Sequence, residues 1–191
     1  MHASPEQQLA FIAYLQRIFT EGDFVATYKC ALLHGIADIA IGRNADSHEL
    51  AAARTITLDE LAAKFVELYW QHSLPYSATE ESAALLKQSS GRQAIMLTEL
   101  SRLREEGVSS VTALRGHSAW RPLIARVRRI LIEGPLWRLQ ILGGQEVCHL
   151  YPHHKGADHI CLNPGILYCL HRFYDLVVSL SRQHGCSLSA T

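Results

Sequence analysis

The sequence predicts a mainly α protein: a multi-helix bundle with a small antiparallel β-hairpin or three-stranded sheet before the last helix. Up to about residue 134, apolar residues recur at spacings of three and four, which is the period of helices with one buried face. Further along, shorter alternating stretches flank Gly143-Gly144, a pair typical of hairpin turns. We therefore expect a helical domain (1–134), a hairpin with the C-terminal helix packed on it (135–184) and a polar tail (185–191).

The composition is that of a globular chain. Of its 191 residues, 48% are hydrophobic, which is enough for a sizeable core. The most apolar stretch, 24–41, is interrupted by Lys29, His34 and Asp38, so no membrane span is expected. The N-terminus has neither the basic nor the apolar segment of a signal peptide, which indicates a cytoplasmic protein. The odd number of cysteines, five, disfavours a disulfide framework.

The first two helices are predicted from their end signals. Ser4, Pro5 and Gln7 provide an N-cap, a first-turn proline and a capping-box partner. The buried side of this helix should hold Leu9, Ile12, Leu15 and Phe19. A second helix, capped by Asp23, is apolar around most of its circumference and should lie at the centre of the bundle.

More helices are expected along the middle of the chain. Thr57 and Glu60 form a capping box that opens a helix ending before Pro75. Helical patterns follow at 79–88, 92–104, 109–114 and 118–132.

The predicted strands lie near the C-terminus. Residues 136–142 and 146–151 flank the glycine pair and should form the hairpin, to which 159–162 can add a third strand. Asn163-Pro164 should then start one final helix that continues to Leu180.

A net charge of zero conceals a division along the chain. Residues 1–91 hold 6 basic and 11 acidic side chains, residues 92–138 hold 9 and 4, and the remainder holds 3 of each. All nine basic residues of the middle segment are arginines, whose planar group suits two-pronged contacts with phosphate or carboxylate. Two interpretations stay open: a nucleic-acid surface, or a patch that docks on the acidic N-terminal half.

Side chains that can bind a metal are densest in one segment. They are Cys148, His149, His153, His154, His159 and Cys161. A zinc site needs four such groups converging on one point, but the sequence has no Cys-x2-Cys pair, and a proline lies between the first two histidines. We favour a histidine-rich surface loop over a metal site, and we assign no metal ligand and no cofactor to this chain.

Other chemical signatures are incomplete. The order of an HNH nuclease motif is present in four residues, Asp158, His159, Asn163 and His171. Only three residues separate the first histidine from the asparagine, too few for the strands and loop of such a site. The sequence also lacks the phosphate-binding glycine loops, the Gly-x-Ser-x-Gly elbow and the His-Glu-x-x-His motif. No catalytic residue is therefore predicted.

His34 and Asp38 lie one helical turn apart in the second helix. Because they are surrounded by apolar residues, we expect them to form a buried pair that fixes how this helix docks, rather than a catalytic pair.

Seven short segments between residues 20 and 184 carry a family resemblance. They are Thr27-Tyr-Lys-Cys-Ala-Leu-Leu, Ala37-Asp-Ile, Leu61-Ala-Ala-Lys-Phe, Leu68-Tyr-Trp, Gln88-Ser-Ser-Gly-Arg-Gln93, Leu162-Asn-Pro-Gly-Ile and Leu170-His-Arg-Phe. Together they resemble the N-terminal region of bacterial HNH-endonuclease-type proteins. The resemblance implies that a separate C-terminal HNH module, which holds the divalent metal and the catalytic residues, would begin where this chain ends.

The resemblance further implies metal-dependent cleavage of nucleic acid by the full protein, in defence against foreign DNA. This chain would then be the non-catalytic region that binds DNA or positions the nuclease module. For phosphate contact we select five arginines: Arg115, Arg121, Arg126, Arg128 and Arg129. One alternative is a stand-alone interaction or regulatory protein whose arginines pair internally or bind an acidic protein. Another is a small zinc-binding protein.

Overall fold

The structure, a computed structural model, describes residues 3–21, 27–43, 54–70, 92–154 and 156–184. These residues are mainly helical, with two antiparallel sheets of two strands each, which confirms the predicted fold class. The helix predicted at 79–88 and the cap predicted at Asp23 lie outside the described residues.

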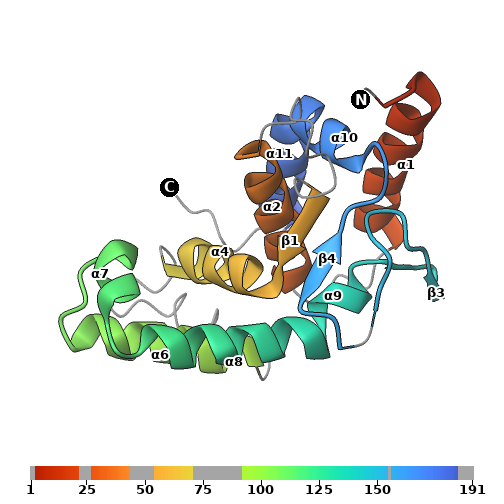
Figure 1. Cartoon of the computed structure of the whole chain (residues 1–191). Helices are drawn as coiled ribbons and strands as arrows, with labels where there is room; N and C mark the ends of the chain where they lie inside the picture. The colour runs from red at the N-terminus through yellow and green to blue at the C-terminus, as the bar shows by residue number, and fades with distance from the viewer. Residues whose placement is uncertain (1–2, 22–26, 44–53, 71–91, 155, 185–191) are drawn as a thin grey trace.

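The elements are shown in Figure 1. The helices are α1 (Pro5–Glu21), α2 (Thr27–Ile41), α4 (Leu58–Trp70), α6 (Arg92–Glu105), α7 (Val111–Gly116), α8 (Trp120–Glu133), α9 (Pro135–Arg138), α10 (Ile166–Arg172) and α11 (Tyr174–His184). The strands are β1 (Thr55–Thr57), β2 (Ile141–Leu142), β3 (Gln145–Glu146) and β4 (His159–Cys161).

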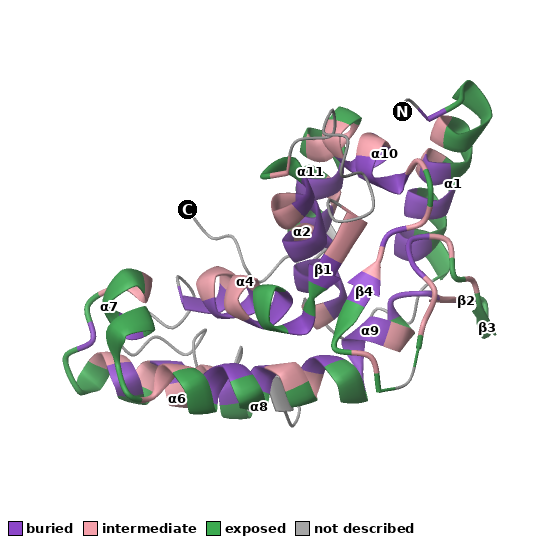
Figure 2. Ribbon diagram, viewed as in Figure 1, coloured by how far each residue is buried: buried purple, intermediate pink, exposed green. Residues whose placement is uncertain are grey.

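Helix α2 lies at the centre of the bundle, as its all-round apolar pattern predicts. It packs against α4 and α9 on one side and against α10 and α11 on the other. Figure 2 shows buried residues along most of its length, and they form part of a core shared with the other helices. Helix α4 packs in turn on α8, while α1 contacts α10 and α11 at the opposite end. This chain of contacts positions α8 at one edge of the molecule.

Helix α1 begins as predicted, and its predicted buried face is correct at Leu15 and Phe19 but not at Leu9. The Ser4 amide donates to Gln7 Oε1 at 2.8 Å, and the Gln7 amide donates to Ser4 Oγ at 3.3 Å, which confirms the capping box. The buried residues are Phe11, Tyr14, Leu15, Ile18 and Phe19. Leu9 is 67% exposed, so its predicted burial is wrong. At 100° per residue it lies on the side of the helix opposite the aromatic and aliphatic stripe.

The hairpin forms around Gly143 and Gly144, whose φ angles of 54° and 78° suit a turn that only glycine adopts easily. Both strands are shorter than predicted: β3 ends at Glu146 rather than at residue 151, and β2 spans only Ile141–Leu142 because residues 136–138 belong to α9 rather than to a strand. Pro135 explains the difference, since a proline at the first helical position is preorganised for a helix.

The predicted third strand exists as β4 but does not join the hairpin. It pairs with β1, with Ile56 opposite Ile160. The 1–134 and 135–184 division remains a prediction, and this strand pair crosses it.

The single final helix that was predicted is wrong: α10 ends at Arg172 and α11 starts at Tyr174.

Among the described residues, no helix combines the length and the apolar character that crossing a membrane requires.

Candidate functional site

The candidate site is the outer face of α8, which carries four of the five selected arginines. Its inner face is apolar, and Leu123, Ile124, Val127 and Leu131 are buried. These positions lie at helical spacing and face α4, so the arginines between them are directed away from the core. The local pattern therefore determines that the arginines lie on the surface.

Two of the selected arginines are engaged with acidic side chains of neighbouring helices. Arg115, at the end of α7, forms an ion pair with Glu67 of α4, and its guanidinium carbon lies 5.6 Å from the centre of the Trp120 ring. Arg126 lies 3.4 Å from Glu99 of α6. Both contacts tie the arginine-rich segment to the rest of the bundle.

Glu67 is held by two cations at once. Burial alone would raise the pKa of this carboxyl, but hydrogen bonds and charge from Lys64 and Arg115 outweigh it and leave the pKa below its usual value. The Lys64 ammonium lies 2.7 Å from Glu67 Oε2. Glu67 is therefore ionised at neutral pH and neutralises much of the charge of Arg115.

Arg128 lies among carboxylates at the start of α4 and of β4. Its Nη1 is 3.5 Å from Asp59 Oδ1. The pKa of Asp158 lies below its usual value, chiefly because His159 Nδ1 donates a 2.8 Å hydrogen bond to it, with a further contribution from the charge of Arg128. The exposed pairs of this region contribute little stability each, since solvent screens them.

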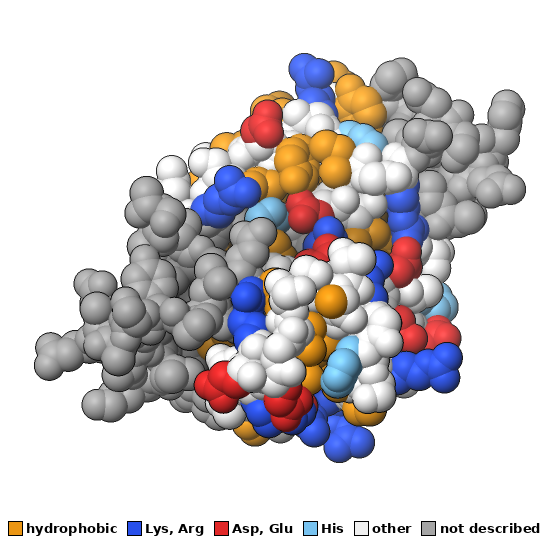
Figure 3. Space-filling model, turned by 90° about the vertical axis from the view of Figure 1, so that its left-hand side faces the viewer, with side chains coloured by type: hydrophobic (Ala, Val, Ile, Leu, Met, Phe, Trp, Pro, Cys, Tyr) orange, Lys and Arg blue, Asp and Glu red, His pale blue; other side chains and the backbone are white. Residues whose placement is uncertain are grey.

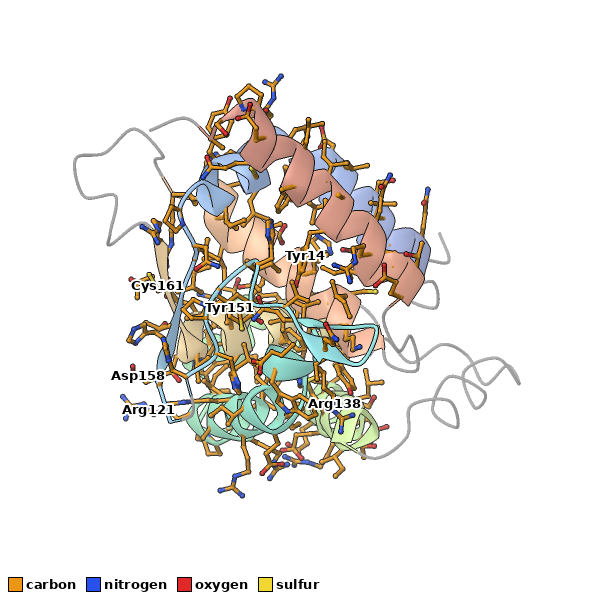
Figure 4. The ribbon with its side chains drawn as sticks, turned by 90° about the vertical axis from the view of Figure 1, so that its right-hand side faces the viewer. Tyr14, Arg121, Arg138, Tyr151, Asp158 and Cys161 are labelled. Atoms are coloured by element: carbon orange, nitrogen blue, oxygen red, sulfur yellow. The ribbon has the colours of Figure 1, made fainter. Side chains whose placement is uncertain are left out.

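The remaining two arginines, Arg121 and Arg129, are exposed. Neither forms an ion pair with another described side chain. Figure 4 shows Arg121 projecting from the body of α8 into solvent. On the face seen in Figure 3, basic and acidic side chains lie next to one another rather than in separate areas. Because three of the five selected arginines pair with carboxylates, the five do not form one uniform cationic surface.

Four of the six candidate metal ligands make contacts with other side chains, and only two of these four share a partner. His149 stacks on Tyr14 with ring centres 4.6 Å apart, and Cys148 Sγ donates to Glu146 at 3.5 Å. His153 Nδ1 lies 3.9 Å from the same glutamate, whereas His159 bonds Asp158. Within the described ranges, no three His, Cys, Asp or Glu side chains are arranged to hold a metal ion.

The four residues that occur in the order of an HNH motif do not gather at one site. Asn163 Nδ2 donates to the carbonyls of Cys148 and His149, at 2.8 and 2.9 Å, and so holds the chain after the hairpin. His171 lies on α10. The asparagine is therefore occupied in fixing a backbone turn.

Sequence reasoning missed Gln140, which is fully buried between α9 and β2. Its Nε2 donates to the Tyr151 carbonyl at 2.8 Å, and its Oε1 accepts from the amides of Leu150 and Tyr151 at 3.0 and 3.2 Å. The signal that could have indicated it was a glutamine with an apolar residue on each side, Leu139 and Ile141.

Comparisons with protein-family models, with curated proteins and with solved structures found no match to this chain.

Proposed function

We propose that this chain is the non-catalytic helical region of an HNH-type nuclease, that it acts in the cytoplasm, and that it contacts DNA through the outer face of α8. The family resemblance suggests the class. The exposure of Arg121 and Arg129 carries the DNA-binding part, because each guanidinium is exposed and has no acidic partner among the described side chains. Free guanidinium groups on a helix surface are suited to phosphate oxygens.

The spacing of these two arginines supports contact with more than one phosphate. They are eight residues apart, so their positions differ by about 12 Å along the axis of α8. Arg126 and Arg128 lie between them along α8, but each has a carboxylate within 3.5 Å. A phosphate would have to compete with those carboxylates, so these two should contribute less to binding.

An alternative function has an observation in its favour. Arg115, Arg126 and Arg128 all pair with carboxylates of α4 or α6, as expected if the arginines serve the fold and the chain is a stand-alone interaction protein. Under this alternative, Arg121 and Arg129 would be ordinary solvated residues.

Binding of a labelled DNA duplex at several salt concentrations separates the two. We expect binding that does not depend on DNA sequence. The logarithm of its association constant should fall linearly with the logarithm of the salt concentration. The double variant Arg121→Gln/Arg129→Gln should weaken binding and reduce the steepness of this dependence by about two units, one for each phosphate that an arginine no longer neutralises.

The matched control is Arg126→Gln/Arg128→Gln, which removes the same charge from the same helix. This control should reduce the steepness of the salt dependence clearly less than Arg121→Gln/Arg129→Gln does. Equal effects of the two double variants would show that only net charge matters, and affinity independent of salt would reject the proposal and favour the interaction protein.

A further inference from the structure

Helix α1 carries a second apolar surface on the side that faces away from the core. Leu9 is 67% exposed there, the largest exposure of any big hydrophobic side chain among the described residues. Ile12, Ala13 and Gln16 follow it at helical spacings, and the four lie within about 100° of the helix circumference. Ile12 is half-buried, whereas Ala13 and Gln16 are exposed. We call these four residues the outer strip of α1.

The outer strip lies at the edge of the molecule. Helix α1 contacts α10, α11 and β2, and its buried residues Phe11, Leu15 and Ile18 lie on the side opposite the strip. Figure 4 shows α1 in front of α2 and α11, at the surface of the molecule. The strip is therefore available to another molecule.

Few charges interrupt this surface. Of the 17 residues of α1, only Glu6, Arg17 and Glu21 are charged, and none of the three lies within the strip. A helix with one side in water ordinarily carries charged and polar residues along that side. Aliphatic side chains in that place leave apolar area in contact with water, so covering them is favourable. The pattern is that of a helix packed on both sides.

Two charges that border the strip are arranged in a self-complementary way. Glu6 and Arg17 are 11 residues apart, which is close to three full turns, so they lie along the same border. Consider two α1 helices packed antiparallel about a twofold axis that passes between residues 11 and 12. Glu6 of each copy is then level with Arg17 of the other, whereas a parallel pair would place like charges side by side.

The same axis also matches the apolar side chains. Leu9 of each copy falls between Ala13 and Gln16 of the other, where alanine leaves room for it. Arg17 can make the new contact while it keeps its present one. It binds Glu21 through Nε at 2.9 Å and Nη2 at 2.8 Å, and Nη1 has no partner among the described residues.

We infer that the outer strip of α1 binds the outer strip of a second copy of this chain, with the two helices antiparallel. The aliphatic side chains supply the attraction, and the Glu6–Arg17 pairs select the direction. One helix from each copy buries less surface than the roughly 1,200–2,000 Å² of a stable complex, so we expect a dissociation constant of about 10–100 µM. This inference goes beyond DNA binding and does not depend on it.

Sedimentation equilibrium of the full chain from about 1 to about 300 µM tests the inference. The wild type should change from monomer to dimer over this range. Leu9→Lys places a charge in the strip and should raise the dissociation constant at least about tenfold. Because Leu9 is exposed, this change should leave the fold intact, which circular dichroism checks. Ile95→Lys, at an exposed hydrophobic position of α6, is the matched control and should leave dimerisation unchanged.

A charge exchange tests the direction of the helices. Arg17→Glu should weaken dimerisation by at least about threefold, and Glu6→Lys/Arg17→Glu should restore it. A monomer over the whole concentration range would overturn the inference, as would a dimer that Leu9→Lys leaves unchanged or that Ile95→Lys weakens equally. Failure of the exchanged pair to restore dimerisation would also overturn it, since antiparallel packing requires these charges to meet.

Discussion

The Tyr174 hydroxyl donates a 2.7 Å hydrogen bond to Oδ1 of Asp38, which joins the first residue of α11 to α2. The same carboxylate lies 3.4 Å from His34 Nε2 and 3.7 Å from Lys64 Nζ of α4. Burial alone would raise the pKa of Asp38, but bonds from His34 and Tyr174 and the charge of Lys64 lower it below its usual value. Three helices thus meet at one ionised carboxylate. The predicted His34–Asp38 pair forms as part of this larger cluster, but both residues are half-buried rather than buried.

Removing the Tyr174 hydroxyl should loosen the attachment of α11. We expect Tyr174→Phe to lower the free energy of unfolding by about 1–2 kcal/mol, since it removes a partly buried hydrogen bond to a charged group while keeping the ring. Urea unfolding measures the effect. Ser179→Ala, an exposed change on the same helix, should alter stability much less, and equal losses in the two variants would contradict a specific role for the hydrogen bond.

Acid should destabilise the protein through His149. Burial lowers the pKa of this imidazole, and its Nε2 is buried without a hydrogen-bond partner among the described residues. The folded state therefore prefers neutral His149. Its contribution is complete above the unfolded pKa of about 6.5 and declines as pH falls below that value.

His149→Phe, which retains a ring against Tyr14, should remove this dependence. The free energy of unfolding of both proteins is measured at pH 7.5 and at pH 5.5. Because the other titrating groups are the same in both proteins, their contributions cancel when the two losses of stability are compared. The wild type should lose more stability than the variant on acidification. An identical loss in both proteins would mean that His149 is protonated without cost.

Substitution of Gln140 should lower the stability of the fold far more than its position in the short connection between α9 and β2 suggests. Gln140→Leu leaves the amides of Leu150 and Tyr151 and the Tyr151 carbonyl without their partner. Each buried polar group left without a hydrogen bond costs roughly 1–3 kcal/mol. We expect a total loss of about 3 kcal/mol or more, measured by thermal or urea unfolding. Gln145→Leu, at an exposed position of β3, should cost little. A small loss at Gln140 would indicate that water replaces the amide.

The capping box of α4 provides a local test of stability. The Thr57 amide donates to Glu60 Oε2 at 2.8 Å, and the Glu60 amide donates to Thr57 Oγ1 at 3.2 Å. Thr57→Ala should therefore lower stability by about 1 kcal/mol. Thr98→Ala, an exposed change inside α6, should be neutral or slightly stabilising, because alanine is the better helix former. Equal effects at the two sites would argue against the cap.

Features that depend on near neighbours were predictable. Both capping boxes join residues three positions apart, and the glycine turn needs only two adjacent residues, so their geometry follows from local chemistry. The face of α8 that carries the arginines follows in the same way from its apolar period. The error at 136–138 arose where two local signals competed, an alternating pattern and the proline that begins α9.

The sequence did not predict which distant segments of the chain contact one another. Strand β4 alternates like a hairpin strand, but its partner is β1, about a hundred residues earlier, and nothing in either segment identifies the other. The same holds for the arginines. Their number and type indicate a basic segment, whereas Glu67, Glu99 and Asp59 neutralise three of them only because α4 and α6 pack beside α7 and α8.

The amino-acid order alone determined the helical class, the starts of the two helices with capping boxes and the position of the glycine turn, because these depend on backbone preferences and contacts within a few residues. Tertiary packing decided which of the selected arginines have a carboxylate partner and which strand β4 pairs with. Such contacts join distant segments, and their energies appear only when a shared core brings those segments together.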